Sequence, residues 1–192
     1  MTAERRRYTV RVFLALPLPE ETKTILKSIN KKIKKLYSEL KFVNTENMHI
    51  TMHFFGELPD YNVEELKRIL ENPALKVPVI KSECGSLDFF PSSGKPRVIY
   101  INLQEGGDFI SQYQNKLEDM LEDAGFKREQ KVFKPHMTLA RNKYLFIDRH
   151  KLKELTISDG PFFIDRLVLY KSILHKHGPE YISLKTVYFK QN

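Results

Sequence analysis

The feature that most constrains this chain is a short pattern, histidine followed two positions later by threonine, that occurs twice among its 192 residues. The two copies are His49-Ile50-Thr51-Met52 and His136-Met137-Thr138-Leu139. Each copy lies in a short apolar run that is typical of a β-strand. Because side chains alternate between the two faces of a strand, each histidine projects beside its threonine and away from the apolar residues.

The segments around the two copies follow one order: strand, long amphipathic helix, histidine strand, short helix, strand. In the first half these predicted segments are 8–16, 20–40, 48–55 (ended by Gly56), 63–70 and 77–90. In the second half they are 97–103, 108–124 (capped by Gly125), 136–140, 148–155 and 162–170. A basic loop at 175–179 and a strand at 181–189 complete the chain.

This order has two explanations. Any α+β protein can give such a pattern by chance, but the histidine–threonine pattern falls at the same place in both halves. We therefore interpret the chain as an internal duplication with little residual identity. The fold class that follows is α+β, with two antiparallel sheets that carry helices on their outer faces.

The composition indicates what kind of partner the chain binds and in which cellular compartment it is expected. The formal net charge is +8, which favours a polyanionic partner such as nucleic acid, although many small basic proteins bind none. The single cysteine, Cys84, cannot form a disulfide within the chain, so nothing points to an oxidising compartment. No window approaches the ~20 apolar residues of a membrane-spanning helix, and the expected location is cytoplasmic.

Two imidazoles facing one cleft suit acid–base chemistry on a phosphodiester. The attacking nucleophile must lose a proton and the leaving oxygen must gain one, and histidine serves either role near neutral pH. Threonine hydroxyls donate hydrogen bonds to the non-bridging phosphoryl oxygens. A 2′,3′-cyclic phosphate is an apt substrate because its ring is strained and one ring oxygen leaves as water attacks.

A metal site is the rival interpretation of the first histidine strand, where His49 and His53 are four residues apart. On a helix that spacing would put both imidazoles on one face, where they could bind a metal ion, but the surrounding residues indicate a strand. No nearby carboxylate or cysteine completes a metal set, so we expect neither a metal nor a cofactor. On strict strand alternation His53 shares the face of His49, and we expect it at the cleft edge or on the surface.

The roles of several other basic residues remain open. Arg141 points away from His136 on strict alternation, and it either turns to the phosphate at the strand end or pairs with a surface carboxylate. His175 and His177 lie in the basic loop, where they contact an RNA backbone or are simply exposed, and His150 is expected in solvent. No phosphate-binding loop, Rossmann glycine pattern or nucleophile elbow is present, which removes support for nucleotide-triphosphate hydrolysis and serine esterase chemistry.

The paired motifs resemble those of the 2H phosphoesterase superfamily, and within it the LigT-type RNA 2′,3′-cyclic phosphodiesterases, also called 2′-5′ RNA ligases. The resemblance covers nearly the whole chain. Besides the two motifs, the segments that carry it are 11–15, 42–43, 54–57, 96–99, 125–126, 135–141, 169–172 and 178–181. Either motif alone is a weak signal, whereas both motifs in this order with these flanks are a specific one.

The resemblance implies one domain over residues 1–192, made of two interleaved, pseudo-symmetric lobes around a central cleft. It implies metal-independent hydrolysis of RNA 2′,3′-cyclic phosphate ends, or of related nucleotides, to 2′-phosphomonoesters by a monomeric enzyme. His49 would be the proton donor and His136 the proton acceptor, while Thr51, Thr138 and Arg141 would hold the phosphate. The alternatives are 2′-5′ ligation or cleavage of 2′-5′ linkages by the same histidines, and a non-catalytic nucleotide- or RNA-binding module.

Two places depart from the family pattern. His53 stands where a lysine or another residue is common, and the sequence His175-Lys176-His177 is less typical. Neither place touches the two motifs, so these departures bear on substrate preference alone.

Overall fold

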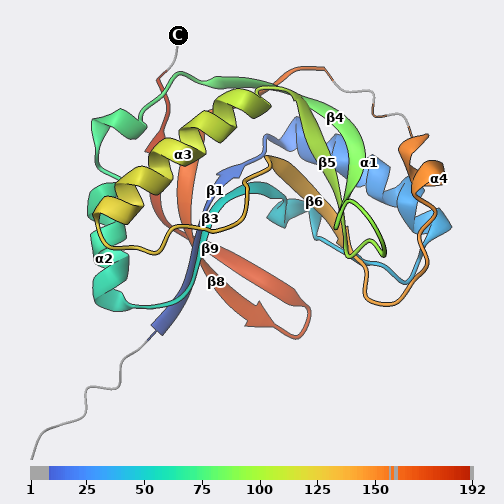
Figure 1. Cartoon of the computed structure of the whole chain (residues 1–192), viewed down its shortest axis with the longest axis horizontal. Coiled ribbons are helices and arrows are strands. Elements are labelled where there is room, and N and C mark those ends of the chain that lie inside the picture. The colour runs from blue at the N-terminus through green and yellow to red at the C-terminus, as the bar shows by residue number, and fades with distance from the viewer. Residues whose placement is uncertain (1–8, 156, 158–159, 191–192) are drawn as a thin grey trace, which may run out of the picture.

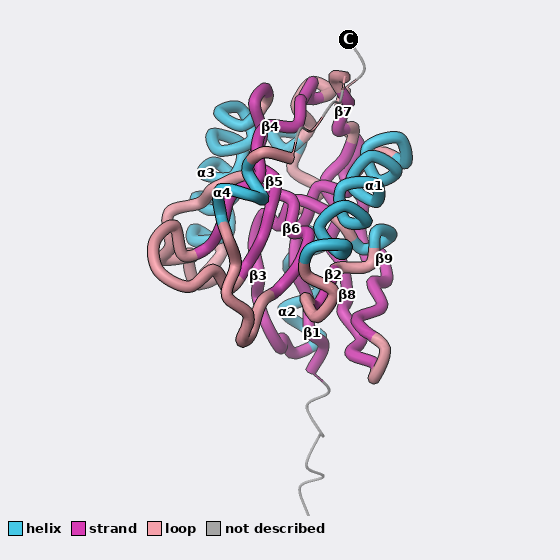
Figure 2. Tube along the Cα trace, turned by 90° about the vertical axis from the view of Figure 1, so that its right-hand side faces the viewer, coloured by secondary structure: helices cyan, strands magenta, loops and turns pink. Residues whose placement is uncertain are grey.

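The computed structural model describes residues 9–155, 157 and 160–190. It is an α+β protein in which a curved antiparallel sheet carries helices on its outer surfaces (Figure 1). In Figure 2 the strands run through the middle of the molecule, with α1 on one side and α3 and α4 on the other. Within the described residues, no helix has the length and apolar character needed to cross a membrane.

The elements of the first half are β1 (Thr9–Pro17), α1 (Glu20–Leu36), β2 (Lys41–Phe42), β3 (His49–Pro59), α2 (Asp60–Ile69) and β4 (Ile80–Phe90). Those of the second half are β5 (Val98–Glu105), α3 (Gly107–Asp123), β6 (His136–Arg141), α4 (Arg149–Lys153), β7 (Phe162–Ile164), β8 (Arg166–His175) and β9 (Gly178–Tyr188). Short 3-10 turns occur at Thr45–Asn47 and Pro73–Leu75.

The strand order shows the predicted duplication in space. Across the described residues the order is β7-β4-β5-β6-β3-β1-β8-β9, with β2 beside β6. The histidine strands β3 and β6 are therefore central, β1 and β5 flank them, and β8 and β4 come next. Since β4 of the first half pairs with β5, and β8 of the second half pairs with β1, each half gives a strand to the other lobe. The α+β prediction is confirmed; the single-domain organisation stays a prediction, which this exchange supports.

The two lobes meet at a narrow seam. Between β3 and β6 the described residues form one paired position, Ile50 opposite Met137. The sheet predicted for each lobe thus joins the other into a continuous path, but the two histidine strands share little backbone hydrogen bonding.

The long helices follow their predicted amphipathic pattern. Helix α1 buries Leu26, Ile29 and Ile33 and exposes lysines on its other faces, which keeps apolar side chains out of water. It ends at Leu36, four residues before the predicted end, because Tyr37 leaves helical geometry. Helix α3 ends where predicted: Gly125 has a φ of +86°, and the next amide, Phe126 N, donates to Leu121 O.

Among the differences from the predicted bounds, three change how strands pair or turn. Strand β3 continues past Gly56, whose φ of +73° accommodates an irregularity opposite Val12 and Phe13 instead of a strand end. The predicted strand 162–170 breaks at Asp165 into β7, which pairs with β4, and β8, which pairs with β1. The predicted loop 175–179 is the tight turn of a β8–β9 hairpin, in which His175 pairs with Gly178. Tyr8, predicted to begin the first strand, lies outside the described residues.

Candidate active site

Each histidine strand contains a β-bulge directly after its threonine. Along β1, Ala15 pairs with Thr51 and Leu14 with His53, which leaves Met52 without a partner in this ladder. Along β5 the pairing is equivalent: Tyr100 pairs with Thr138 and Ile99 with Ala140, and Leu139 is skipped. An extra residue in one strand moves every following side chain to the opposite face.

The bulges decide which side chains reach the cleft. Before the bulge the predicted alternation is confirmed, because His49 and Thr51 are half-buried while Ile50 and Met52 are buried. After it, His53 turns into the core, and Phe54, which strict alternation would place with Ile50 and Met52, is exposed and lines the cleft cavity. In β6 the same shift carries Arg141 to the cavity, although strict alternation points it away from His136.

Both imidazoles are held in the same way. Nδ1 of His49 lies 2.7 Å from the backbone oxygen of Asn47, and Nδ1 of His136 lies 2.6 Å from that of Lys134. A carbonyl oxygen only accepts hydrogen bonds, so Nδ1 carries the hydrogen in each ring. Nε2 is left as the atom that exchanges a proton. In His49 it lies 3.0 Å from the Thr51 hydroxyl, which donates to it while the ring is neutral.

Aromatic rings surround each imidazole. The rings of Phe13 and Tyr181 lie with centroids 5.0 and 5.5 Å from His49. Those of Phe90 and Tyr100 lie 5.0 and 5.1 Å from His136. These apolar surroundings keep water away from the rings, which disfavours the imidazolium form.

The pKa values of both histidines fall accordingly. Burial lowers the pKa of His49 to about 4; the Asn47 carbonyl opposes the shift and the charge of His136 adds to it. Burial also lowers the pKa of His136, opposed by the Lys134 carbonyl and increased by the charge of Arg141. In the free protein both imidazoles are therefore neutral at pH 7, with lone pairs on Nε2.

One cavity of about 840 Å³ collects most of the predicted site. His49, Thr51, Thr138 and Arg141 line it together with Arg11, Lys41, Phe54, Tyr181 and the β8–β9 hairpin. His136 is not among the lining residues. Its charge acts on the pKa of His49 and that of Arg141 acts on His136, so it borders this group within electrostatic reach.

The lining is strongly basic. Lys41 in β2 stands directly opposite Arg141 in β6, so both side chains leave the same face of the sheet. Like charges at directly opposed positions are destabilising unless an anion lies between or beside them. Arg11 adds a third cation, with its guanidinium 4.7 Å from the ring centroid of Phe54. This charge pattern fits a phosphate group.

The sequence interpretation missed several residues of the site. Asn47 uses its backbone oxygen to hold His49 and its side chain to donate to Pro179 O at 2.6 Å, which connects the imidazole to the hairpin. Phe13 and Tyr181 are far from both motifs in sequence. An available signal was Asn44, a capping residue before the turn Thr45–Asn47, because its side chain accepts from Glu46 N.

His53 is the clearest error of the sequence interpretation. It is 5% exposed, lies in the core rather than at the cleft edge, and contacts Glu118 of α3. His150 is exposed on α4, and His175 and His177 are exposed at the hairpin tip, where they line the cavity. In the described ranges, no group of three or more His, Cys, Asp or Glu side chains is placed to hold a metal ion.

Comparison with known proteins gives a consistent result. Residues 16–100 and 102–181 match the family described as LigT like Phosphoesterase. An RNA 2′,3′-cyclic phosphodiesterase of Methanocaldococcus jannaschii is 34% identical over 182 residues, covering 92% of this chain and 99% of the relative. Another of that name, from Archaeoglobus fulgidus, is 31% identical over 179 residues, covering 92% and 98%.

Solved structures share the fold. A crystal structure of a Thermus thermophilus protein superimposes with a TM-score of 0.81 at 23% identity, covering 93% of this chain and 97% of the other. Escherichia coli LigT complexed with 3′-AMP superimposes with a TM-score of 0.75 at 20% identity, covering 96% and 100%. From the matched family, the relatives and the paired histidine strands, this chain belongs to the LigT-like phosphoesterases.

Proposed function

We propose that this protein hydrolyses the 2′,3′-cyclic phosphate ends of RNA to 2′-phosphomonoesters. The observation that carries the proposal is the matched pair of histidine–threonine units, each with Nδ1 fixed by a carbonyl and Nε2 left for proton exchange. The relatives named RNA 2′,3′-cyclic phosphodiesterase share 34% and 31% identity with it over most of its length, which supports the same activity.

The proposed mechanism gives the two imidazoles opposite tasks. Nε2 of His136 takes a proton from water as the water oxygen bonds to phosphorus. Nε2 of His49 gives a proton to the 3′ oxygen as the bond between that oxygen and phosphorus breaks. Thr51, Thr138 and Arg141 hold the non-bridging oxygens, where charge is held in the transition state. Proton exchange with solvent then restores both rings.

His49 needs a proton before it can act as the acid, because its pKa in the free protein is about 4. A bound phosphodiester carries one negative charge. At ~4 Å and an effective dielectric constant of ~20, that charge stabilises an imidazolium by ~4 kcal/mol, which corresponds to ~3 pKa units. Substrate binding thus raises the pKa of His49 to near neutral pH. Once protonated, Nε2 no longer accepts from the Thr51 hydroxyl, so that hydroxyl can donate to the phosphate while Nε2–H serves the 3′ oxygen.

The test uses an RNA ending in a 2′,3′-cyclic phosphate, in the presence of a chelator. We expect a 2′-phosphate product, and we expect His49→Asn and His136→Asn each to reduce kcat by ~10²–10⁴. The matched control is His150→Asn, which changes an exposed histidine on α4 and should leave turnover unchanged. Absence of ring opening, or full turnover by either active-site variant, would contradict the proposal; binding without turnover would favour a binding module.

The proposal includes a monomeric protein that works in the cytoplasm. The support for a monomer is that one chain supplies the histidines, the threonines and the basic residues of the cavity. A molar mass from light scattering tests this part, and a value of twice 22.6 kDa in the active fraction would contradict it.

A further inference from the structure

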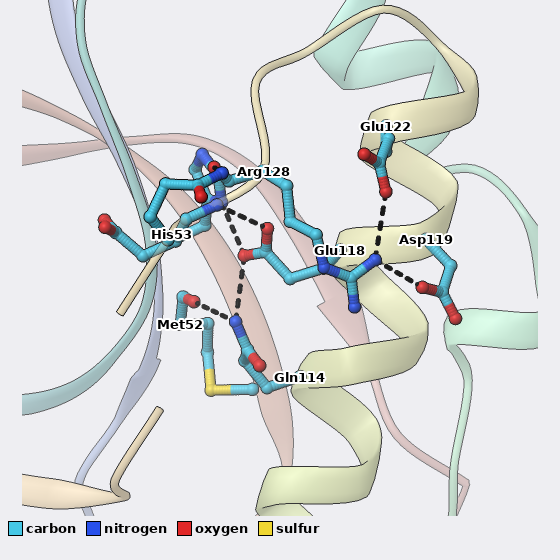
Figure 3. A network of polar contacts seen from close by, with 9 residues as sticks. Met52, His53, Gln114, Glu118, Asp119, Glu122 and Arg128 are labelled. Atoms are coloured by element: carbon cyan, nitrogen blue, oxygen red, sulfur yellow. Dashed lines mark hydrogen bonds and ion pairs between the residues drawn. The ribbon is translucent and has the colours of Figure 1, made fainter. Parts of the chain in front are cut away.

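A buried polar cluster connects α3 to the core side of β3. Nδ1 of His53 donates to Oε1 of Glu118 across 2.6 Å, and the two residues are 5% and 2% exposed. Gln114, one turn earlier in α3, is 4% exposed and donates from Nε2 to the same oxygen at 2.8 Å. Figure 3 shows Gln114 and Glu118 projecting from α3 toward Met52 and His53.

This cluster contacts β3 on one side and the segment before β6 on the other. On one side, Gln114 Nε2 also contacts the backbone oxygen of Met52 at 3.4 Å, and Met52 is the bulge residue that follows Thr51. On the other side, the second oxygen of Glu118 accepts from the backbone N–H of Glu129 at 3.1 Å. Glu129 belongs to the segment that leads from α3 into β6.

That segment ends at the residues that orient His136. Five positions after Glu129 comes Lys134, whose backbone oxygen holds Nδ1 of His136 at 2.6 Å. Arg128, beside Glu129, adds ion pairs to Asp119 and Glu122 at 2.6 and 3.1 Å on the surface of α3 (Figure 3). One buried carboxylate therefore connects the strand that carries His49 with the segment that presents His136.

The active site requires such a connection because its two halves are weakly joined. Within the described residues, β3 and β6 are paired at Ile50 and Met137 alone. Acid and base must both reach one phosphate, and a misplacement of ~1 Å costs up to ~10² in rate. The shared core and the pairing of β2 with β6 add to this contact, and the cluster behind β3 supplies a further, directional constraint.

The energetics of the cluster also favour a role in geometry over a role in stability. Removing a histidine and a carboxylate from water is costly, so a buried pair of this kind contributes little net stability compared with well-packed apolar side chains. Its contribution lies in geometry, because hydrogen bonds fix direction and distance while apolar contacts do not. His53 and Glu118 are buried on the core side of β3, behind the cleft, so they take no direct part in the reaction.

We propose that His53, Gln114 and Glu118 are positioning residues that set the placement of the His49 strand relative to His136. The inference rests on the proposed cyclic phosphodiesterase activity. It concerns residues outside both motifs, and it gives a role to the histidine that the sequence misplaced.

The test replaces the whole cluster with apolar residues in the triple variant His53→Leu, Gln114→Leu, Glu118→Leu, so that no buried charge is left alone. We expect a melting temperature within ~5 °C of the parent protein. We expect kcat on an RNA cyclic phosphate to fall by roughly tenfold to a hundredfold, with KM changed less than about threefold. A fall in kcat without loss of folding or binding is the sign of misplaced catalytic groups.

The conservative variant His53→Asn separates positioning from packing, because its amide donates to Glu118 although the imidazole is gone. It should keep at least about a third of the parental kcat. Lys116→Ala, on the exposed face of α3 between Gln114 and Glu118, is the control and should behave like the parent. If the triple variant does not fold, Gln114→Met should show the same split on a smaller scale.

Each outcome is decisive. Parental kcat in the triple variant or in folded Gln114→Met, or equal losses in His53→Asn and the triple variant, would overturn the positioning role. Inactivity of the parent protein itself would instead contradict the proposed function.

Discussion

His49 and His136 both carry the ring hydrogen on Nδ1, and both have aromatic neighbours. They differ in how strongly burial disfavours the imidazolium form. His49 is the more enclosed ring, with a pKa lowered to about 4. The sequence motifs are symmetric and assign neither role; the donor role of His49 comes from the family resemblance. With a pKa of about 4 in the free protein, a proton donor at His49 would take its proton from solvent once the bound phosphate has raised that pKa, and this gives the proposed reaction a specific pH dependence.

We predict different pH optima for kcat/KM and kcat. The profile of kcat/KM reports the free enzyme, in which the pKa values of both His49 and His136 are below 6.5, so its maximum should lie below pH 6.5. The profile of kcat reports the substrate complex, in which the phosphate raises both pKa values, so its maximum should lie at higher pH. Steady-state kinetics from pH 4 to 9 measures both. Coincident optima would show that substrate binding does not change the protonation of the pair.

The buried imidazole of His49 should also affect stability at low pH. Its folded pKa of about 4 lies below the unfolded value near 6.5, so below pH 6.5 the unfolded chain binds a proton that the folded one excludes. The sign is therefore a loss of stability as pH falls. We predict that His49→Asn reduces the loss between pH 7 and 4.5 by ~2.5 kcal/mol, measured by urea unfolding. The exposed His150→Asn should reduce it little; equal effects would contradict the assignment.

At the scale of elements, the β8–β9 hairpin is the part of the cavity wall with the least defined role. His175 and His177 line the cavity at its tip, and the hairpin extends away from the rest of the sheet (Figure 1). The ion pair between His175 and Glu180 at 2.8 Å is exposed, so it contributes little to stability. We therefore expect His175 and His177 to contact the nucleotides next to the cyclic end.

We predict that the double variant His175→Ala, His177→Ala raises KM for an oligoribonucleotide by roughly threefold to tenfold, because side-chain contacts to the RNA backbone are lost. KM for a 2′,3′-cyclic mononucleotide, which lacks that further RNA backbone, should stay the same. The control is His150→Ala. An equal increase for both substrates would place the hairpin's effect at the cyclic phosphate itself.

The sequence predicted which segments form helices and strands better than it predicted how the strands pair with their neighbours. Side-chain alternation correctly put each histidine on the same, less buried strand face as its threonine, and amphipathic spacing located both long helices. It failed after each threonine, because a bulge depends on how a strand matches its neighbour and not on its own composition. His53 was misplaced for that reason, and the orientation of Arg141 stayed open between the phosphate and a surface carboxylate.

The other errors were long-range as well. The break at Asp165 is set by which strands lie next to β7 and β8, namely β4 and β1, and these are distant in sequence. Asn47, Phe13 and Tyr181 join the site through tertiary contacts, so no local pattern marks them. In contrast, a histidine–threonine pair on one strand face is a local property, and it was predictable from the chain alone.

For the whole molecule, the two lobes share strands by exchange yet meet at one paired position between β3 and β6. The net charge of +8 is distributed unevenly over the molecule. The second half of α1 exposes Lys27, Lys31, Lys32, Lys34 and Lys35, and the cavity contains Arg11, Lys41 and Arg141. Such a field attracts a polyanion over a longer range than a single phosphate contact.

RNA binding by the whole molecule should therefore depend on salt far more than binding of a mononucleotide does. Each cation that neutralises a phosphate of single-stranded RNA contributes about −0.7 to the slope of log K against log salt. With two or three such contacts, affinity for an oligoribonucleotide ending in a 2′-phosphate should fall about 5- to 20-fold between 50 and 200 mM salt. Lys41→Ala should reduce the slope by about 0.7 without changing sequence preference. Fluorescence anisotropy measures the slope, and a value near zero would mean that the positive charge of the chain is not used for RNA.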